Sequence, residues 1–175
     1  MKRWFIMVFS LLLLLSVCGC HYNEQGDIRE PVEFFYPRVS DSFLYGASDG
    51  VIAGEIREAS GRVGDLNYLL TMYLRGPQSS GLRSPFPAGC KLSAISWEGS
   101  ILWVSLSSEF AALENLELTL ACASLAKTCF SISSAAAVRL MAESETQTVS
   151  MTVSPDDLWL ADYSAFETLS ATEEP

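Results

Sequence analysis

Residues 74–91 read LRGPQSSGLRSPFPAGCK, and this stretch decides the fold. Gly76 suits the position that follows a helix C-terminus, because a residue without Cβ adopts the left-handed conformation freely. Pro77 cannot continue a helix. The rest of the stretch is too long for a tight turn and too apolar for a linker, since Leu82 and Phe86 need to be packed. We therefore predict an ordered, shaped loop that leads from a helix into a strand.

The residues before this stretch predict a helix. Asp65 suits the N-cap position, and apolar residues then recur at helix spacing up to Leu74. A second helix is predicted over residues 113–130, where Cys122 and Cys129 share an apolar face with leucines. Both helices are expected to bury one face against a sheet.

The residues after the stretch predict a β-hairpin, with strands at 91–97 and 101–106 around a turn at Glu98-Gly99. This turn places Trp97 opposite Ser100. One face is richer in apolar residues and is the expected core face; it carries Ile95, Trp97, Leu102, Val104 and Leu106. The opposite face still presents Ile101 and Trp103.

Further strands are predicted at 32–36, 43–45, 51–57, around 138–140 and at 149–153. A turn is expected between residues 143 and 146. The order strand, helix, strand, strand, helix, strand indicates an α+β fold. We predict a single small mixed sheet with two helices packed on one face, plus extra N-terminal strands.

Composition limits the class of partner. The chain has 175 residues and a formal net charge of −10, which falls to −12 if Lys2 and Arg3 are removed with a signal peptide. An acidic chain is poorly suited to nucleic acid or to electrostatic docking on anionic lipid. One domain is expected.

The N-terminus resembles a lipoprotein signal. A basic pair precedes an apolar run, and the sequence Val17-Cys18-Gly19-Cys20 resembles a lipobox with Cys20 as the lipidated residue. The register ending at Cys18 fits less well, and an uncleaved anchor or an ordinary signal peptide is the alternative. The prediction is a signal peptide at 1–19, a tether at 20–31, a domain at 32–154 and a partly disordered extension at 155–175. The domain would be anchored to the outer face of the cytoplasmic membrane.

The sequence offers little catalytic chemistry. His21 is the only histidine and lies beside the predicted lipid, so no Ser-His-Asp or Cys-His arrangement is expected. Three cysteines, Cys90, Cys122 and Cys129, fit no disulfide framework and are interpreted as small buried hydrophobes. No metal or cofactor motif is present. An enzyme using Glu109 and the Asp156-Asp157 pair is the weaker hypothesis, since such acids commonly serve turns and caps.

Six segments together resemble the GerM-type (GerMN) sporulation and spore-germination domain. They are VEFFYP at 32–37, GEIRE at 54–58, LRGP at 74–77, GLRSPFPAG at 81–89, VSLSSEF at 104–110 and KTC at 127–129. The residues that match the family motifs most closely are Gly76, Pro77, Gly81, Leu82, Ser84, Pro85, Pro87, Gly89 and Thr128. The chain departs from the pattern by an insertion at 40–48, by Cys90 and Cys129 in place of Thr and Leu, and by a last turn without Gly.

The resemblance implies a ring-building-like fold, no catalytic residues and no cofactor. It also implies a lipoprotein of a spore-forming Gram-positive bacterium that helps to assemble an envelope complex through a protein partner. Ile101, Trp103, Leu82 and Phe86 are the candidate contact residues. The alternatives are that Trp103 lies under a terminal segment and that the loop residues only shape the fold. A ligand-binding or sensory lipoprotein outside sporulation remains the second hypothesis, and no oligomeric state is predicted.

Overall fold

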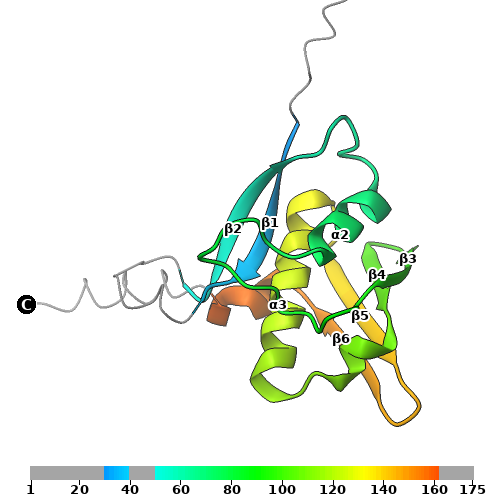
Figure 1. Cartoon of the computed structure of the whole chain (residues 1–175). Coiled ribbons are helices and arrows are strands. Elements are labelled where there is room, and N and C mark those ends of the chain that lie inside the picture. The colour runs from blue at the N-terminus through cyan, green and yellow to red at the C-terminus, as the bar shows by residue number, and fades with distance from the viewer. Residues whose placement is uncertain (1–29, 40–49, 162–175) are drawn as a thin grey trace, which may run out of the picture.

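The computed structural model describes residues 30–39 and 50–161, and these form an α+β domain, as predicted (Figure 1). Two strands come first, followed by a helix, a hairpin, a long helix and a second hairpin. In chain order the elements are β1 (Pro31–Pro37), β2 (Ile52–Glu58), α2 (Leu66–Leu74), β3 (Leu92–Glu98), β4 (Ile101–Leu106), the 3-10 helix η2 (Ser108–Ala112), α3 (Asn115–Ile132), β5 (Ala137–Glu143), β6 (Thr148–Val153) and the 3-10 helix η3 (Pro155–Ala161).

The larger sheet is mixed and has the strand order β3-β4-β5-β6. The two hairpins β3-β4 and β5-β6 are antiparallel, and β4 and β5 pair in parallel. A parallel pair requires a crossover connection. η2 and α3 supply this crossover between β4 and β5. This is the predicted small mixed sheet.

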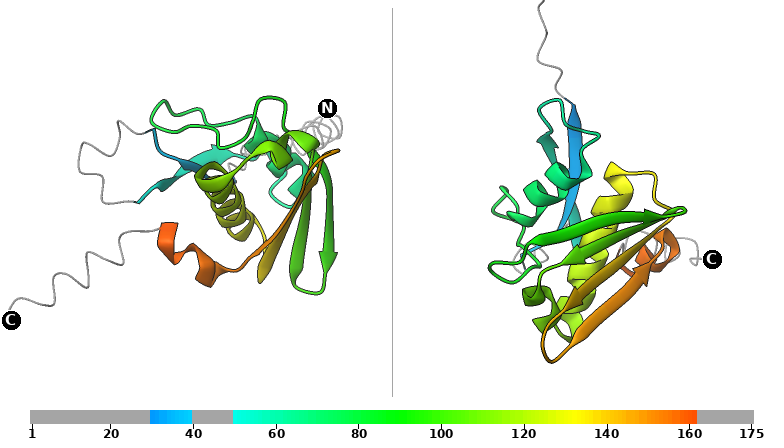
Figure 2. Two further views of the ribbon diagram at one scale, coloured as in Figure 1. Left: turned by 90° about the horizontal axis from the view of Figure 1, so that it is seen from below. Right: turned by 90° about the vertical axis from the view of Figure 1, so that its right-hand side faces the viewer.

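The strands β1 and β2 pair with each other and form a two-stranded antiparallel sheet of their own. α3 lies between this sheet and the larger one, so that the domain has three layers (Figure 2). The predicted N-terminal strand, β1, is therefore present. However, α3 separates both β1 and β2 from the larger sheet. α3 is buried on more than one face, and small residues such as Ala121, Ser124 and Ala126 allow both layers to approach it.

The hairpin β3-β4 has a different register from the one predicted. Glu98 pairs with Ile101 and Trp97 pairs with Leu102, so the turn consists of Gly99 and Ser100 rather than Glu98-Gly99. The predicted register was wrong by two residues. Because side chains alternate with a period of two, this shift leaves the two faces unchanged. The core face is therefore as predicted on β4, where Leu102, Val104 and Leu106 are buried, whereas Trp97 on the edge strand is 46% exposed.

The core contains a chain of aromatic rings that crosses the layers. The rings of Tyr36 and Tyr73 stack at 4.7 Å between centroids, and those of Tyr73 and Phe86 meet edge to face at 5.4 Å. The ring centroids of Phe86 and Phe110 are in turn 6.2 Å apart. The thiols at positions 90, 122 and 129 are free and buried, as predicted.

Several predictions concern residues that the structure does not describe. They are the signal peptide, lipidated Cys20 and most of the tether, the strand at 43–45 and most of the C-terminal extension. Within residues 30–39 and 50–161, no helix has the length and apolar character that crossing a membrane requires.

Candidate functional site

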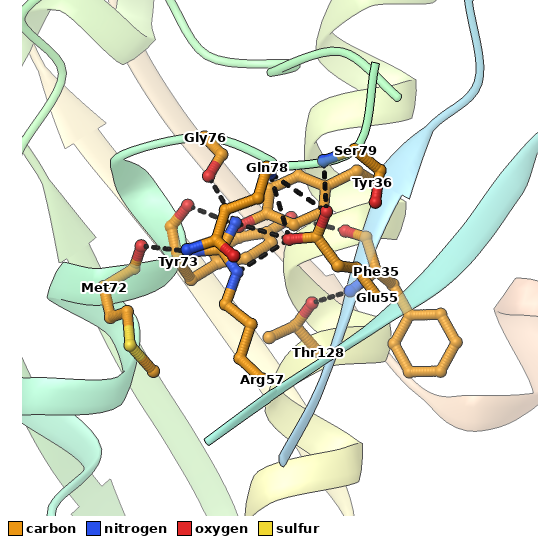
Figure 3. A network of polar contacts seen from close by, with 10 residues as sticks. All are labelled: Phe35, Tyr36, Glu55, Arg57, Met72, Tyr73, Gly76, Gln78, Ser79 and Thr128. Carbon is orange, nitrogen blue, oxygen red and sulfur yellow. Dashed lines mark hydrogen bonds and ion pairs between the residues drawn. The ribbon is translucent and has the colours of Figure 1, made fainter. Parts of the chain in front are cut away.

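A buried ion pair on β2 lies beside the start of the 74–91 stretch. Glu55 and Arg57 are two residues apart on one strand, so their side chains share a face. Each is 7% exposed, and Arg57 Nε donates a 2.6 Å hydrogen bond to Glu55 Oε1 (Figure 3). The Arg57 guanidinium also lies over the rings of Phe34 and Tyr36, 5.5 and 5.7 Å from their centroids. A charge pair at this depth requires further hydrogen bonds to be tolerated.

Arg57 obtains its further hydrogen bonds from the end of α2. Its Nη2 donates to the Gly76 carbonyl at 2.6 Å, and its Nη1 donates to the Met72 carbonyl at 3.4 Å. The last carbonyls of a helix have no partner within the helix. Arg57 therefore caps the C-terminus of α2 from a neighbouring strand.

Glu55 holds the two loop residues that follow Pro77. Its carboxylate accepts hydrogen bonds from the backbone N–H of Gln78, at 2.9 and 3.1 Å, and from that of Ser79 at 2.7 Å (Figure 3). Burial acts to raise the pKa of Glu55, but the bonds from Ser79, Gln78 and Arg57 outweigh it, so the pKa is lowered. The ionised carboxylate is thus the form that fixes the loop.

Gly76 has φ = +89°, the left-handed conformation predicted for the residue after a helix. Its N–H donates to the Tyr73 carbonyl at 3.0 Å. The predicted N-cap is also confirmed, since the Asp65 carboxylate accepts from the Tyr68 N–H at 2.9 Å. α2 is thereby capped at both ends, and its C-terminal end is held in one position relative to β2.

A second set of hydrogen bonds joins α2, β1 and α3. The Tyr36 hydroxyl donates to the Tyr73 carbonyl at 2.8 Å, and the Tyr73 hydroxyl donates to the Phe35 carbonyl at 2.9 Å (Figure 3). The Phe35 N–H donates to Thr128 Oγ1 at 2.9 Å. Burial raises the pKa of both tyrosines, so both hydroxyls remain neutral donors. Thr128 thus connects the two-stranded sheet to the central helix.

The second half of the loop is bound to the end of β1. The Val39 N–H donates to the Gly81 carbonyl and the Arg83 N–H to the Pro37 carbonyl, each at 2.9 Å. Leu82 is half-buried against the core, and Phe86 is 9% exposed inside it. This placement supports the alternative in which the loop residues shape the fold. The Ser84 hydroxyl accepts from the Phe86 N–H, and Pro85 is buried, whereas Pro87 is half-buried and Gly89 is exposed with φ = +87°.

Ile101 and Trp103 lie together on one face of the larger sheet, because they alternate along β4 with the buried Leu102 and Val104. The helices cover the other face of this sheet (Figure 2), so we call the face of Ile101 and Trp103 the outer sheet face. Both are half-buried. The Arg139 guanidinium, on β5, lies 4.5 Å from the centroid of the Trp103 ring and donates from Nε to Thr152 Oγ1 at 2.9 Å. The other members of this face are mainly small or hydroxyl-bearing, but they include Met141 and, at the strand ends, two carboxylates. They are Ala94, Ser96, Glu98, Ser105, Ala137, Met141, Glu143, Thr148, Ser150 and Thr152.

Sequence reasoning did not identify Glu55 and Arg57 as a pair. The available signal was the spacing of two opposite charges at i and i+2 on a strand, which places both on one face. It also missed Arg139, whose position over Trp103 depends on the parallel pairing of β4 with β5. Within the described residues, no group of three or more His, Cys, Asp or Glu side chains is placed to hold a metal ion.

The fold and the network define a class: a small α+β domain in which a buried Glu–Arg pair fixes the crossing from a helix to a hairpin. The chain belongs to the Germane family, described as sporulation and spore germination, which matches residues 47–148. A crystal structure described as that of a lipoprotein from Clostridium perfringens is similar over 79% of this chain and 97% of its own, at 19% identity and a TM-score of 0.43. No curated protein matches the chain.

Proposed function

We propose that this chain is a lipid-anchored, non-catalytic domain on the outer face of the cytoplasmic membrane. It would help to assemble or stabilise an envelope complex in sporulation or spore germination. The observation that carries this proposal is membership of the Germane family, described by those two processes. The lipobox-like Val17-Cys18-Gly19-Cys20 supports the anchor.

The outer sheet face is the surface best suited to the protein partner. Trp and Arg are the residues most enriched among those that dominate binding energy at interfaces. Here the Arg139 guanidinium already lies over the Trp103 ring at the centre of a sheet face, and the side chains around them are Met141 and mainly small or hydroxyl-bearing residues. Trp103 Nε1 is buried and has no acceptor among the described residues. A partner with an apolar side chain beside a carboxylate would complement both the ring and the guanidinium.

Trp103→Glu tests this surface, and Trp97→Glu is its matched control. Trp97 is the exposed tryptophan on the opposite face of the same sheet. Each chain is expressed in a strain that lacks the native gene, and sporulation and germination efficiency are measured together with the thermal midpoint of the purified protein. We expect wild type and Trp97→Glu to restore both processes, and Trp103→Glu to fail while remaining folded.

Two outcomes count against the proposal. If Trp103→Glu unfolds the protein, Trp103 is a structural residue and the contact surface lies elsewhere. If the deletion strain sporulates and germinates normally, the assignment to these processes is wrong.

The anchor is tested by labelling cells with a radioactive fatty acid. Cys20→Ser should abolish incorporation into the chain, whereas Cys18→Ser, its neighbour in the same motif, should retain it. Labelling that persists in Cys20→Ser contradicts the assigned lipidation site. Loss in Cys18→Ser alone would support the register that ends at Cys18.

A further inference from the structure

A hollow lies where the two ends of the 74–91 stretch meet. It has a volume of about 290 Å³ and lies between the last turn of α2 and the start of β3. Its lining residues are Thr71, Leu74, Arg75, Cys90, Lys91 and Leu92. We call it the loop-base hollow. It is separate from the outer sheet face, because α2 forms one of its walls and no helix within the described residues covers the outer sheet face.

The loop-base hollow carries two cations in a chain whose net charge is −10. Most of the other described cations are already engaged: Arg57, Arg62 and Arg83 pair with carboxylates, and Lys127 and Arg139 lie over aromatic rings. Arg75 has no such partner among the described residues. Lys91 is close enough to Glu109 to lower the pKa of that carboxyl, though the hydrogen bond from Ser107 contributes more.

The rest of the lining favours an apolar group. Leu74 and Leu92 supply aliphatic surface, and both are half-buried. Burial, and to a smaller extent the Glu109 carboxylate, raises the pKa of the Cys90 thiol to about 11. The thiol is therefore neutral near pH 7, and Glu109 is the negative charge near this end of the hollow. Ligand sites commonly combine such apolar walls with a few polar groups that fix orientation.

The negative end of a helix normally disfavours an anion. At α2 this effect is reduced, because the buried Arg57 donates to the carbonyls of Met72 and Gly76. The same bonds hold the last turn of α2 in place, and with it Leu74 and Arg75. The hollow is therefore formed before any ligand binds, which lowers the cost of ordering it.

We propose that the loop-base hollow binds a carboxylate carried on a short apolar stem, such as a leucine-sized side chain. Arg75 and Lys91 bind the carboxylate, and the stem lies against Leu74, Leu92 and the Cys90 thiol. Two sources have this chemistry: a free carboxylic acid and the C-terminal end of a peptide. The proposal does not depend on the function proposed above.

The test uses the full-length protein in detergent and follows backbone amide shifts by NMR. The probe is N-acetyl-leucine, compared with N-acetyl-leucinamide, which lacks the charge, and acetate, which lacks the stem. We expect saturable shifts at residues 71–75 and 90–92 for N-acetyl-leucine, with roughly millimolar affinity for so small a ligand. The amide and acetate should each bind at least about fivefold more weakly.

Arg75→Gln and Lys91→Gln should each weaken N-acetyl-leucine binding about fivefold. Arg83→Gln is the matched control, because Arg83 lies in the same stretch but outside the hollow. Thr71→Phe, at an exposed helix position, should block the hollow without disturbing the core. As a second readout, bound probe should slow modification of Cys90, the most exposed of the three described thiols at 8%.

The source is identified by a tetrapeptide, Gly-Gly-Gly-Leu. Binding at least as tight as that of N-acetyl-leucine supports a peptide C-terminus, and loss of binding supports a free acid. The proposal is overturned if all three small probes bind alike, if Arg75→Gln binds as wild type does, or if the shifts fall outside the hollow. Unchanged binding by Thr71→Phe would also overturn it.

Discussion

Replacement of Arg57 by Met tests the role of the buried pair in stability. Met keeps most of the length and apolar volume of the side chain but removes the charge and every donor. Glu55 would then stay at 7% exposure without its cation, and the carbonyls of Gly76 and Met72 would lose their donor. Breaking a buried pair by removing one partner costs about 3–5 kcal/mol. We expect Arg57→Met to lower the free energy of unfolding by about that amount.

The matched control is Arg62→Met. Arg62 also pairs with an acid, Asp65, and also lies over a tyrosine ring, but its pair is 53% and 38% exposed. Exposed pairs contribute about 0–1 kcal/mol. The two arginines thus differ mainly in burial and in the backbone groups that Arg57 serves.

Urea unfolding, followed by circular dichroism, measures both variants, since the unfolding free energy falls linearly with urea concentration. If Arg57→Met is too unstable to measure, Arg57→Lys, which keeps the charge, should lie between it and wild type. The double variant Glu55→Leu/Arg57→Met should remain about 1–3 kcal/mol below wild type, because the buried Gly76 carbonyl stays without a donor. A loss below about 1 kcal/mol in Arg57→Met, or full stability in the double variant, would refute this account of the pair.

The pH dependence provides a separate check. The pKa of Glu55 is lower in the folded state than in the unfolded state. Its contribution to stability is therefore complete above the unfolded pKa and is lost as the pH falls through the folded pKa. Glu55→Gln should reduce the acid-induced loss of stability relative to wild type. Acid unfolding curves with identical slopes in the two proteins would contradict the assignment.

Three further substitutions test other parts of the fold by the same urea assay. Gly76→Ala should cost about 1–2 kcal/mol because φ is +89°, whereas Gly64→Ala, with no positive φ, should be near neutral; equal effects would contradict the left-handed requirement. Thr128→Val should cost about 1–3 kcal/mol by leaving the Phe35 N–H without an acceptor, and wild-type stability would contradict that bond. Phe86→Ala should lower the free energy of unfolding by about 3–5 kcal/mol, because it truncates a core side chain. A loss under about 1 kcal/mol would show that Phe86 is not a core residue and would support its role as a contact residue.

Local patterns predicted the elements of this fold well. The N-cap at Asp65 and the left-handed Gly76 follow from chemistry within one turn of the helix end. The buried faces of β4 and β6 follow from alternation, which explains why the two-residue error in hairpin register left the core face of β4 intact. The position of the turn could not be predicted in this way, because both Glu98-Gly99 and Gly99-Ser100 place a glycine in a two-residue turn.

The division into two sheets could not be predicted in the same way. β2 has alternating buried residues, but its buried positions include Glu55 and Arg57, which a sequence pattern assigns to the surface. The pattern predicts one buried face for α3, yet its buried residues between Ala121 and Cys129 span more than one face, because β1 packs on the side away from the larger sheet. Long-range packing of this kind has no local signal, apart from the high content of small residues in the helix.

The buried pair is better explained by the loop than by the core. An apolar pair on β2 would fill the space between β1 and α2 without the desolvation cost of two charges. It could not, however, bind the carbonyl of Gly76 or the N–H groups of Gln78 and Ser79, which the left-handed turn directs toward the strand. A helix end that turns sharply leaves donors and acceptors of both kinds within a few residues. One cation and one anion on the same strand face satisfy both, and this fixes the last turn of α2, whose end lines the loop-base hollow together with Lys91.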